Sequence, residues 1–162
     1  MKQSIDSAQI YQMLMEEKNL SPSKNVSTYW LQAHSPKLKY FQSNEDTGKW
    51  CIHLEKDEVD ESWLKIKEAC QKDQLFLAKC TTAYSSGTQE HPQFLICVYT
   101  HDWSDTEDVQ KIRQTLREIG FTQPLKYKRD IETINKVYGT DDEFYIVESN
   151  LENTEPKKKI KP

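Results

Sequence analysis

The clearest hydrophobic pattern lies in residues 48–82, which read as a strand, an acidic turn, an amphipathic helix and a second strand. Apolar residues recur at helical spacing through Val59, Trp63 and Ile66, so Trp63 is predicted to pack on a sheet. In the first strand, side chains alternate between two faces, with Trp50, Ile52 and Leu54 on one face and Lys49, Cys51 and His53 on the other.

Two later segments continue this layering. Residues 94–99 form an unbroken apolar run, which predicts a central strand covered on both faces. Residues 104–119 have helical periodicity, with Ser104 as the expected cap and Glu107 three residues later as its capping-box partner. Gly120 is the expected end of this helix.

The remaining pattern is weaker but completes an α+β arrangement. An N-terminal helix is expected at 4–17, strands at 26–33, 38–42, 76–82, 125–128 and 144–148, and a short helix or turn at 130–137. The order of elements predicts one antiparallel sheet with helices on one face. We therefore divide the chain into an N-terminal helix and linker (1–24), an α+β domain (25–149) and a disordered basic tail (150–162).

Composition indicates the domain size and the expected cellular location, but says less about the function. The 162 residues suffice for one domain with a real core, and the net charge of −4 argues against a global basic field for nucleic acid or membrane. No apolar run reaches the roughly 20 residues that span a bilayer, and the N-terminus does not resemble a signal peptide. The expected location is cytoplasmic, with the basic tail as a candidate nuclear element.

The cysteines are predicted to be structural. Cys51, Cys70, Cys80 and Cys97 are far apart and include no Cys-x-x-Cys pair, so neither a zinc site nor another cofactor is expected. Each lies in or beside an apolar segment, where cysteine acts as a small core residue.

Lys79 is the most informative candidate site residue. It stands inside a predicted strand between apolar neighbours, where an unpaired ammonium would be costly. It could bind a phosphate, act as a base whose pKa is lowered by burial, or reach solvent or a carboxylate. His53, on the same predicted face as Lys49, is either an acid catalyst or a surface imidazole.

A basic cluster follows in the next predicted strand. Lys126 and Lys128 share a face, Arg129 adds a third cation, and Tyr127 could stack on a base, as in proteins that bind RNA. Charges that protect an edge strand from aggregation are the alternative. Trp103, in the His-Asp-Trp turn after the central strand, is the best candidate for an exposed aromatic ligand contact.

Several of these motifs resemble a known family. Tyr29-Trp30-Leu31, Gly48-Lys49-Trp50, the ICVYTHDW segment with its acidic helix, and the Tyr127-Lys128 segment are similar to the basophilic-leukemia-expressed (BLES-type) family over about residues 26–148. That resemblance implies the fold of the cap-binding translation initiation factor of the 4E type. This fold is a curved antiparallel sheet backed by helices.

A weaker resemblance is to bacterial phosphothreonine lyases. Lys49-Trp50-Cys51 would align with their Lys-x-His strand, and Lys79 with their catalytic lysine. This resemblance implies that Lys79 abstracts a proton, His53 protonates the leaving phosphate and Lys49 holds it, without a cofactor.

Three functional hypotheses remain open. The leading one is a non-catalytic module that binds a phosphorylated ligand on the concave sheet face through Lys49, Lys79 and Lys128. This ligand is either a nucleotide or RNA, or a phosphopeptide. The second is the lyase-like enzyme, which eliminates phosphate from phosphothreonine. The third is an interaction scaffold that docks a protein partner through residues 4–17.

Overall fold

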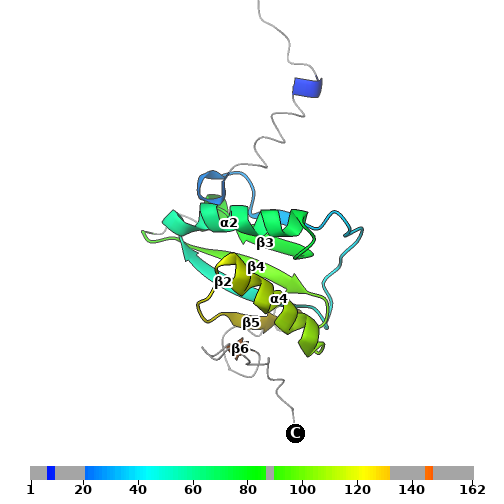
Figure 1. The fold of residues 1–162 in the computed structure, drawn as a ribbon. Helices are drawn as coiled ribbons and strands as arrows, with labels where there is room; N and C mark the ends of the chain where they lie inside the picture. Colours follow the sequence, from blue (N-terminus) through cyan, green and yellow to red (C-terminus); the bar gives the residue numbers. More distant parts are fainter. Residues whose placement is uncertain (1–6, 10–20, 87–89, 132–144, 148–162) are drawn as a thin grey trace, which may run out of the picture.

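The computed structural model describes residues 7–9, 21–86, 90–131 and the backbone of 145–147. It has six antiparallel strands in one sheet, in the spatial order β1-β3-β4-β2-β5-β6. This confirms the predicted α+β class with a curved antiparallel sheet (Figure 1). The strands are β1 (Trp30–His34), β2 (Gly48–Glu55), β3 (Leu77–Thr81), β4 (Gln93–Thr100), β5 (Lys126–Arg129) and β6 (Tyr145–Val147).

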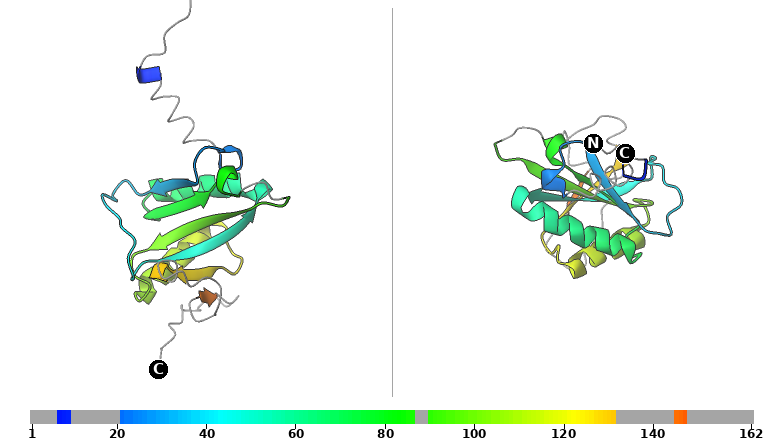
Figure 2. Two further views of the ribbon diagram at one scale, coloured as in Figure 1. Left: turned by 180° about the vertical axis from the view of Figure 1, so that it is seen from behind. Right: turned by 90° about the horizontal axis from the view of Figure 1, so that it is seen from above.

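The two long helices, α2 (Lys56–Gln71) and α4 (Thr106–Ile119), cover the same face of this sheet (Figure 2). They bury their apolar stripes against alternate residues of the strands, as the helical periodicity predicts. Trp63 is 2% exposed, which confirms its predicted packing on the sheet. The core between the layers includes Trp50, Ile52, Leu54, Val59, Ile66, Phe94, Ile96, Val98, Val109, Ile112 and Leu116.

The helix ends follow local capping chemistry. Helix α2 begins with a capping box between Glu55 and Glu58, which satisfies backbone N–H groups at the helix start. Ser104 is not the cap of α4, contrary to the prediction; the Asp105 carboxylate accepts from the Asp108 N–H. The Ser104 hydroxyl instead donates to Asp102. Gly120 ends α4 with a φ of 126°, as predicted.

Strand β1 begins four residues later than the predicted start at residue 26. The side-chain oxygen of Asn25 accepts the backbone N–H groups of Ser27 and Thr28, which folds this segment into a turn. The apolar pattern of 26–29 therefore describes a turn and an exposed approach to the sheet rather than a strand. Just before it lies the short 3-10 helix η1 (Pro22–Lys24).

The strand predicted at 38–42 does not form. Residues 35–47 connect β1 to β2 and contain no strand. Leu38 and Phe41 pack instead on the sheet face that the helices leave open, against Leu77, Cys97 and Tyr99. These contacts cover β4 on its second face, which confirms the prediction of a central strand buried on both sides. Leu38 and Phe41 are three positions apart, so their packing does not follow the two-residue repeat of a strand.

The predictions at the chain ends are tested only in part. Of the helix expected at 4–17, residues 7–9 are described, and they are helical. Of the element expected at 130–137, residues 130–131 are described, also as helix. The tail 150–162 lies outside the described residues. A four-residue helix, α3 (Ala83–Ser86), follows β3. Within the described part of the chain, no helix is both long and apolar enough to cross a membrane.

Candidate functional site

Strand register gathers the predicted lysines on the face that α2 and α4 leave open. Lys79 pairs with Cys97, Cys97 with Cys51, and Cys51 with Lys126, so these four residues form one row across β3, β4, β2 and β5. Lys128 pairs with Lys49 two residues along the strands. We call this side of the sheet the lysine face. The left view of Figure 2 shows the ribbon from this side, with the strands in front of the two helices.

Lys49 forms a buried ion pair on this face. Its ammonium donates to one carboxylate oxygen of Asp130 at 2.6 Å, and the Ser43 hydroxyl donates to the other oxygen. Lys49 is 9% exposed and Asp130 is 4% exposed. Burial of the Lys49 ammonium works against its charge, but the hydrogen bond and charge of Asp130 outweigh it and raise the pKa of Lys49. Lys49 is thus engaged in a structural pair, which leaves it poorly placed to hold a ligand.

Tyr99 lies between two lysines. The Lys49 and Lys79 ammonium groups lie 5.6 and 5.7 Å from its ring centroid, within the range of a cation–π contact. Burial, followed by the charges of Cys97 and Asp130, raises the pKa of Tyr99, so the phenol remains protonated at neutral pH. The half-buried Lys79 therefore extends over an aromatic surface at the centre of the lysine face.

The two central thiols of the row interact. The hydrogen bond from Cys97, aided by the charges of Lys49 and Lys128, lowers the pKa of Cys51 despite burial. The same hydrogen bond, together with burial, raises the pKa of Cys97. All four cysteines are buried and free, in line with their predicted place in the interior.

His53 lies at the far end of β2, beside the exposed Lys126. Partial burial and the Lys126 ammonium lower the pKa of His53. The whole of β4 lies between His53 and Lys79, which alone separates their backbones by about 10 Å. Because Lys79 is in line with Cys51, His53 is also displaced by two residues along β2. The lyase-like roles would require a substrate that bridges this distance, and they remain a prediction.

Tyr127 points to the other face of the sheet. It is 0% exposed and packs edge-on against Trp50, with a centroid distance of 5.0 Å. Its hydroxyl shares a hydrogen bond of 2.6 Å with Thr100. A methyl group at Gly48 would overlap the Tyr127 hydroxyl, so the glycine makes room for this ring. The predicted stacking of Tyr127 on a base therefore does not fit the structure.

Trp103 and Arg129 contact each other away from the lysine face. The Arg129 guanidinium carbon lies 4.5 Å from the Trp103 ring centroid. The Trp103 indole N–H donates to the Glu45 carbonyl at 3.1 Å, and the ring packs against the main core. Arg129 pairs with Gly48 in the sheet, and strand alternation directs it toward the helix-covered side. Arg129 therefore does not share a face with Lys126 and Lys128, with which the sequence analysis grouped it. Trp103, expected as an exposed aromatic, is half-buried.

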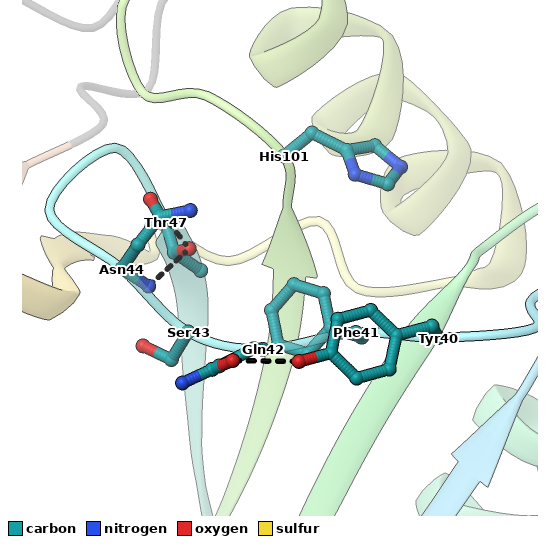
Figure 3. Close-up of a pocket in the computed structure, with 7 residues that line it drawn as sticks. All are labelled: Tyr40, Phe41, Gln42, Ser43, Asn44, Thr47 and His101. Atoms are coloured by element: carbon teal, nitrogen blue, oxygen red, sulfur yellow. Dashed lines mark hydrogen bonds between the residues drawn. The ribbon is translucent and has the colours of Figure 1, made fainter.

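Sequence reasoning missed a pocket of about 400 Å³ beside the lysine face (Figure 3). His101, which stacks on Phe76 at a centroid distance of 3.8 Å, forms one wall. Tyr40 is 77% exposed, and its hydroxyl donates to the Gln42 side chain. The sequence predicted a strand at 38–42, so these residues were not expected to line a pocket. Its lining comprises Tyr40, Phe41, Gln42, Ser43, Asn44, Thr47 and His101.

The pocket adjoins the lysine face through Ser43, which lines the pocket and donates to Asp130. Among the residues that the structure describes, no three His, Cys, Asp or Glu side chains gather as a metal site would require. The described site consists of cations, one carboxylate paired with Lys49, two thiols, aromatic rings and amides.

The chain is an α+β domain in which two helices cover one face of an antiparallel sheet and lysines lie on the other face. Its family follows from comparison with known proteins. A family model described as basophilic leukemia-expressed protein Bles03 matches residues 23–134. The match covers more than half of the 162 residues, and the chain belongs to this family. The resemblance to initiation factors of the 4E type remains a prediction.

Proposed function

We propose that this domain binds a phosphorylated ligand, a nucleotide or the end of an RNA chain, across its lysine face. The observation that carries the proposal is the convergence of Lys79, Lys126 and Lys128 from two different strands on one side of the sheet. Ammonium groups form charge-assisted hydrogen bonds with phosphate oxygens. The chain as a whole is acidic, so such binding depends on this local cluster.

The spacing of the lysines favours an extended ligand. Strands β3 and β5 are three strand intervals apart, which corresponds to about 14 Å. One inorganic phosphate cannot bridge that distance, whereas a chain with several phosphates can contact both sides. The central carboxylate, that of Asp130, is already paired with Lys49 and opposes such a ligand less than an unpaired acid would.

The neighbouring pocket favours a base over a peptide side chain. It offers the planar rings of Tyr40 and His101 beside the amides of Gln42 and Asn44. Aromatic rings stack on bases, and amides form hydrogen bonds with base edges. Because the pocket meets the lysine face at Ser43, one ligand could place a base in the pocket and phosphates on the lysines.

Fluorescence anisotropy of the full chain tests this proposal with three labelled probes at low salt: a nucleoside triphosphate, a short 5′-phosphorylated single-stranded RNA and a phosphothreonine peptide. We expect the first two to bind, and the double substitution Lys126→Ala/Lys128→Ala to weaken binding at least about tenfold and to reduce its salt dependence. Lys65→Ala, which removes an exposed lysine from helix α2, is the matched control.

The proposal fails if none of the probes binds, or if Lys65→Ala weakens binding as much as the double substitution does. Binding of the phosphopeptide alone would overturn the nucleotide assignment and support the peptide alternative. Mass spectrometry of the same peptide tests the lyase-like alternative. Loss of phosphoric acid that disappears in Lys79→Ala would support it.

A further inference from the structure

Two cysteines lie directly opposite each other at the centre of the lysine face. Cys51 on β2 and Cys97 on β4 are register partners in an antiparallel pair. Both belong to the open side of the sheet, because their neighbours Trp50, Ile52, Ile96 and Val98 all lie in the core under the helices. Although 46 positions separate the two cysteines along the chain, the sheet brings their side chains into contact.

The register places their backbones at a separation suited to a disulfide. Directly opposed residues of antiparallel strands have Cα atoms about 4.5 or 5.5 Å apart, depending on the type of pair. Disulfides in proteins join Cα atoms about 4.4–6.8 Å apart. Both types of pair fall inside this range, so the S–S bond could form without separating the strands.

The two thiols are chemically unequal, which favours a defined reaction. Cys97 donates its hydrogen bond to Cys51, and Lys49 and Lys128 add positive charge nearby, so the pKa of Cys51 is lowered. The thiolate is the nucleophilic form of cysteine. The pKa of Cys97 is raised, so Cys97 keeps its proton and is the thiol that reacts second, with the oxidised Cys51.

The other two cysteines provide an internal contrast. Cys70 on α2 and Cys80 on β3 lie in the core under the helices. Burial raises the pKa of each to about 12, so both remain protonated thiols. Cys80 faces Leu31 and Ile96 in the sheet, so it has no cysteine as a register partner.

We propose that Cys51 and Cys97 are a redox modification site that forms a reversible cross-strand disulfide when a small peroxide oxidises the protein. The site does not depend on the proposed ligand. Cys51 is 6% exposed and Cys97 is 2% exposed, so the oxidant in this proposal is a small peroxide rather than another protein. Such disulfides in reducing compartments are usually transient and redox-sensing.

The reaction balances in two steps. The Cys51 thiolate attacks one peroxide oxygen, the O–O bond breaks, and the products are a Cys51 sulfenic acid and a hydroxide that takes up a proton as water. The Cys97 sulfur then attacks the Cys51 sulfur, the S–O bond breaks, and the Cys97 proton leaves with hydroxide as a second water. Two thiols and one peroxide give one disulfide and two waters. Two molecules of a small thiol reverse the bond by exchange: the first breaks the S–S bond and forms a mixed disulfide, and the second displaces the protein thiol and leaves as part of the oxidised reductant.

Peptide mass spectrometry of the wild-type full chain tests the proposal. The reduced protein is treated with one equivalent of hydrogen peroxide, catalase removes the excess, and iodoacetamide labels free thiols in denaturant. We expect a cross-linked peptide containing Cys51 and Cys97, alkylation of Cys70 and Cys80, and recovery of all four thiols after dithiothreitol. Four alkylated cysteines, or a cross-link that includes Cys70 or Cys80, would overturn the proposal.

Variants test the order of the two steps. In Cys97→Ala the sulfenic acid of Cys51 has no partner, so dimedone should trap it on Cys51. In Cys51→Ala, dimedone should leave Cys97 unlabelled, and labelling equal to that of Cys51 would contradict the assigned nucleophile. Cys80→Ala is the matched control and should retain the Cys51–Cys97 cross-link.

Discussion

The two faces of the sheet are made from alternate residues of the same strands, yet their side chains make different kinds of contact. On the helix-covered face, β2 contributes Trp50 and Ile52, which are 1% and 0% exposed in an apolar core. On the lysine face the same strand contributes Lys49 and Cys51, also largely buried but among charges and polar groups. Burial alone therefore does not distinguish the two faces, whereas the nature of the contacts does.

Because of this difference, we expect the helix-covered face to contribute mainly to the stability of the fold and the lysine face mainly to its chemical reactivity. The covered face satisfies its polar groups internally: the Trp50 indole donates to the Val109 carbonyl at 3.1 Å, and the buried Arg113 donates to the Phe121 and Gln123 carbonyls. The lysine face keeps an ion pair, an unequal pair of thiols and cations that face outward. Substitutions on the first face should act on folding, and many on the second should act on chemistry.

The largest expected effect is that of Trp50→Ala. The change removes a buried ring together with its contact with Tyr127 and its hydrogen bond, and should lower the free energy of unfolding by about 3–5 kcal/mol. His53→Ala, three positions along the same strand and exposed, should change it by less than about 0.5 kcal/mol. Urea denaturation followed by circular dichroism measures both. An equal decrease in the free energy of unfolding for both variants would contradict the proposed difference between the two faces.

A second substitution tests whether the lysine face also holds the fold together. Lys49→Met should lower the free energy of unfolding by about 3 kcal/mol, because it leaves the buried Asp130 carboxylate without its cation. The Lys49→Met/Asp130→Asn double variant should recover part of this loss, because no uncompensated charge remains. An additive loss in the double variant would argue that the ion pair is not coupled.

The same pair has a pH signature. The pKa of Lys49 in the folded protein is raised above its ordinary value of 10.5. Its contribution to stability is therefore complete below pH 10.5 and declines as the pH rises through the folded-state pKa. The difference in the free energy of unfolding between wild type and Lys49→Met should shrink as the pH rises through that alkaline range.

The smallest effect concerns His53. Since partial burial and Lys126 lower its pKa, Lys126→Ala should raise it part of the way toward 6.5, while the effect of burial remains. NMR titration of the imidazole protons measures the shift, and Lys65→Ala should leave it unchanged. With a folded-state pKa below 6.5, His53 contributes stability that is present above this pH and is lost as the pH falls. An unchanged pKa in Lys126→Ala would show that the ammonium does not act on the imidazole.

Periodicity predicted the elements whose burial is regular along the chain. In β2 the alternation of Trp50 and Ile52 with Lys49 and Cys51 assigned the correct side chains to each face, because a strand repeats every two residues. It failed where a local contact replaced the repeat. Hydrogen bonds to the Asn25 side chain form a turn where β-branched and aromatic residues predicted a strand. Phe41 contacts Phe76 and Tyr99 although its segment pairs with no strand.

For the candidate site, the sequence predicted positions within each strand but not the contacts between strands and loops. The sequence indicated that Lys126 and Lys128 share a face and that Lys79 lies inside a strand. It did not indicate that Tyr127 would be fully buried beneath Trp50, since its neighbours in sequence are all cationic. The pocket around Tyr40 had no sequence signal, because its walls come from a connection and from His101, far along the chain.

The α+β class, the helices with their apolar stripes and the two sides of β2 follow from the amino-acid sequence, because they depend on spacing within a segment. Which residues of different strands meet does not follow from that spacing. The pairs Lys49–Asp130 and Cys51–Cys97 join positions far apart in the chain. Their contact depends on strand order and register, which are set by the packing of the whole sheet beneath its two helices.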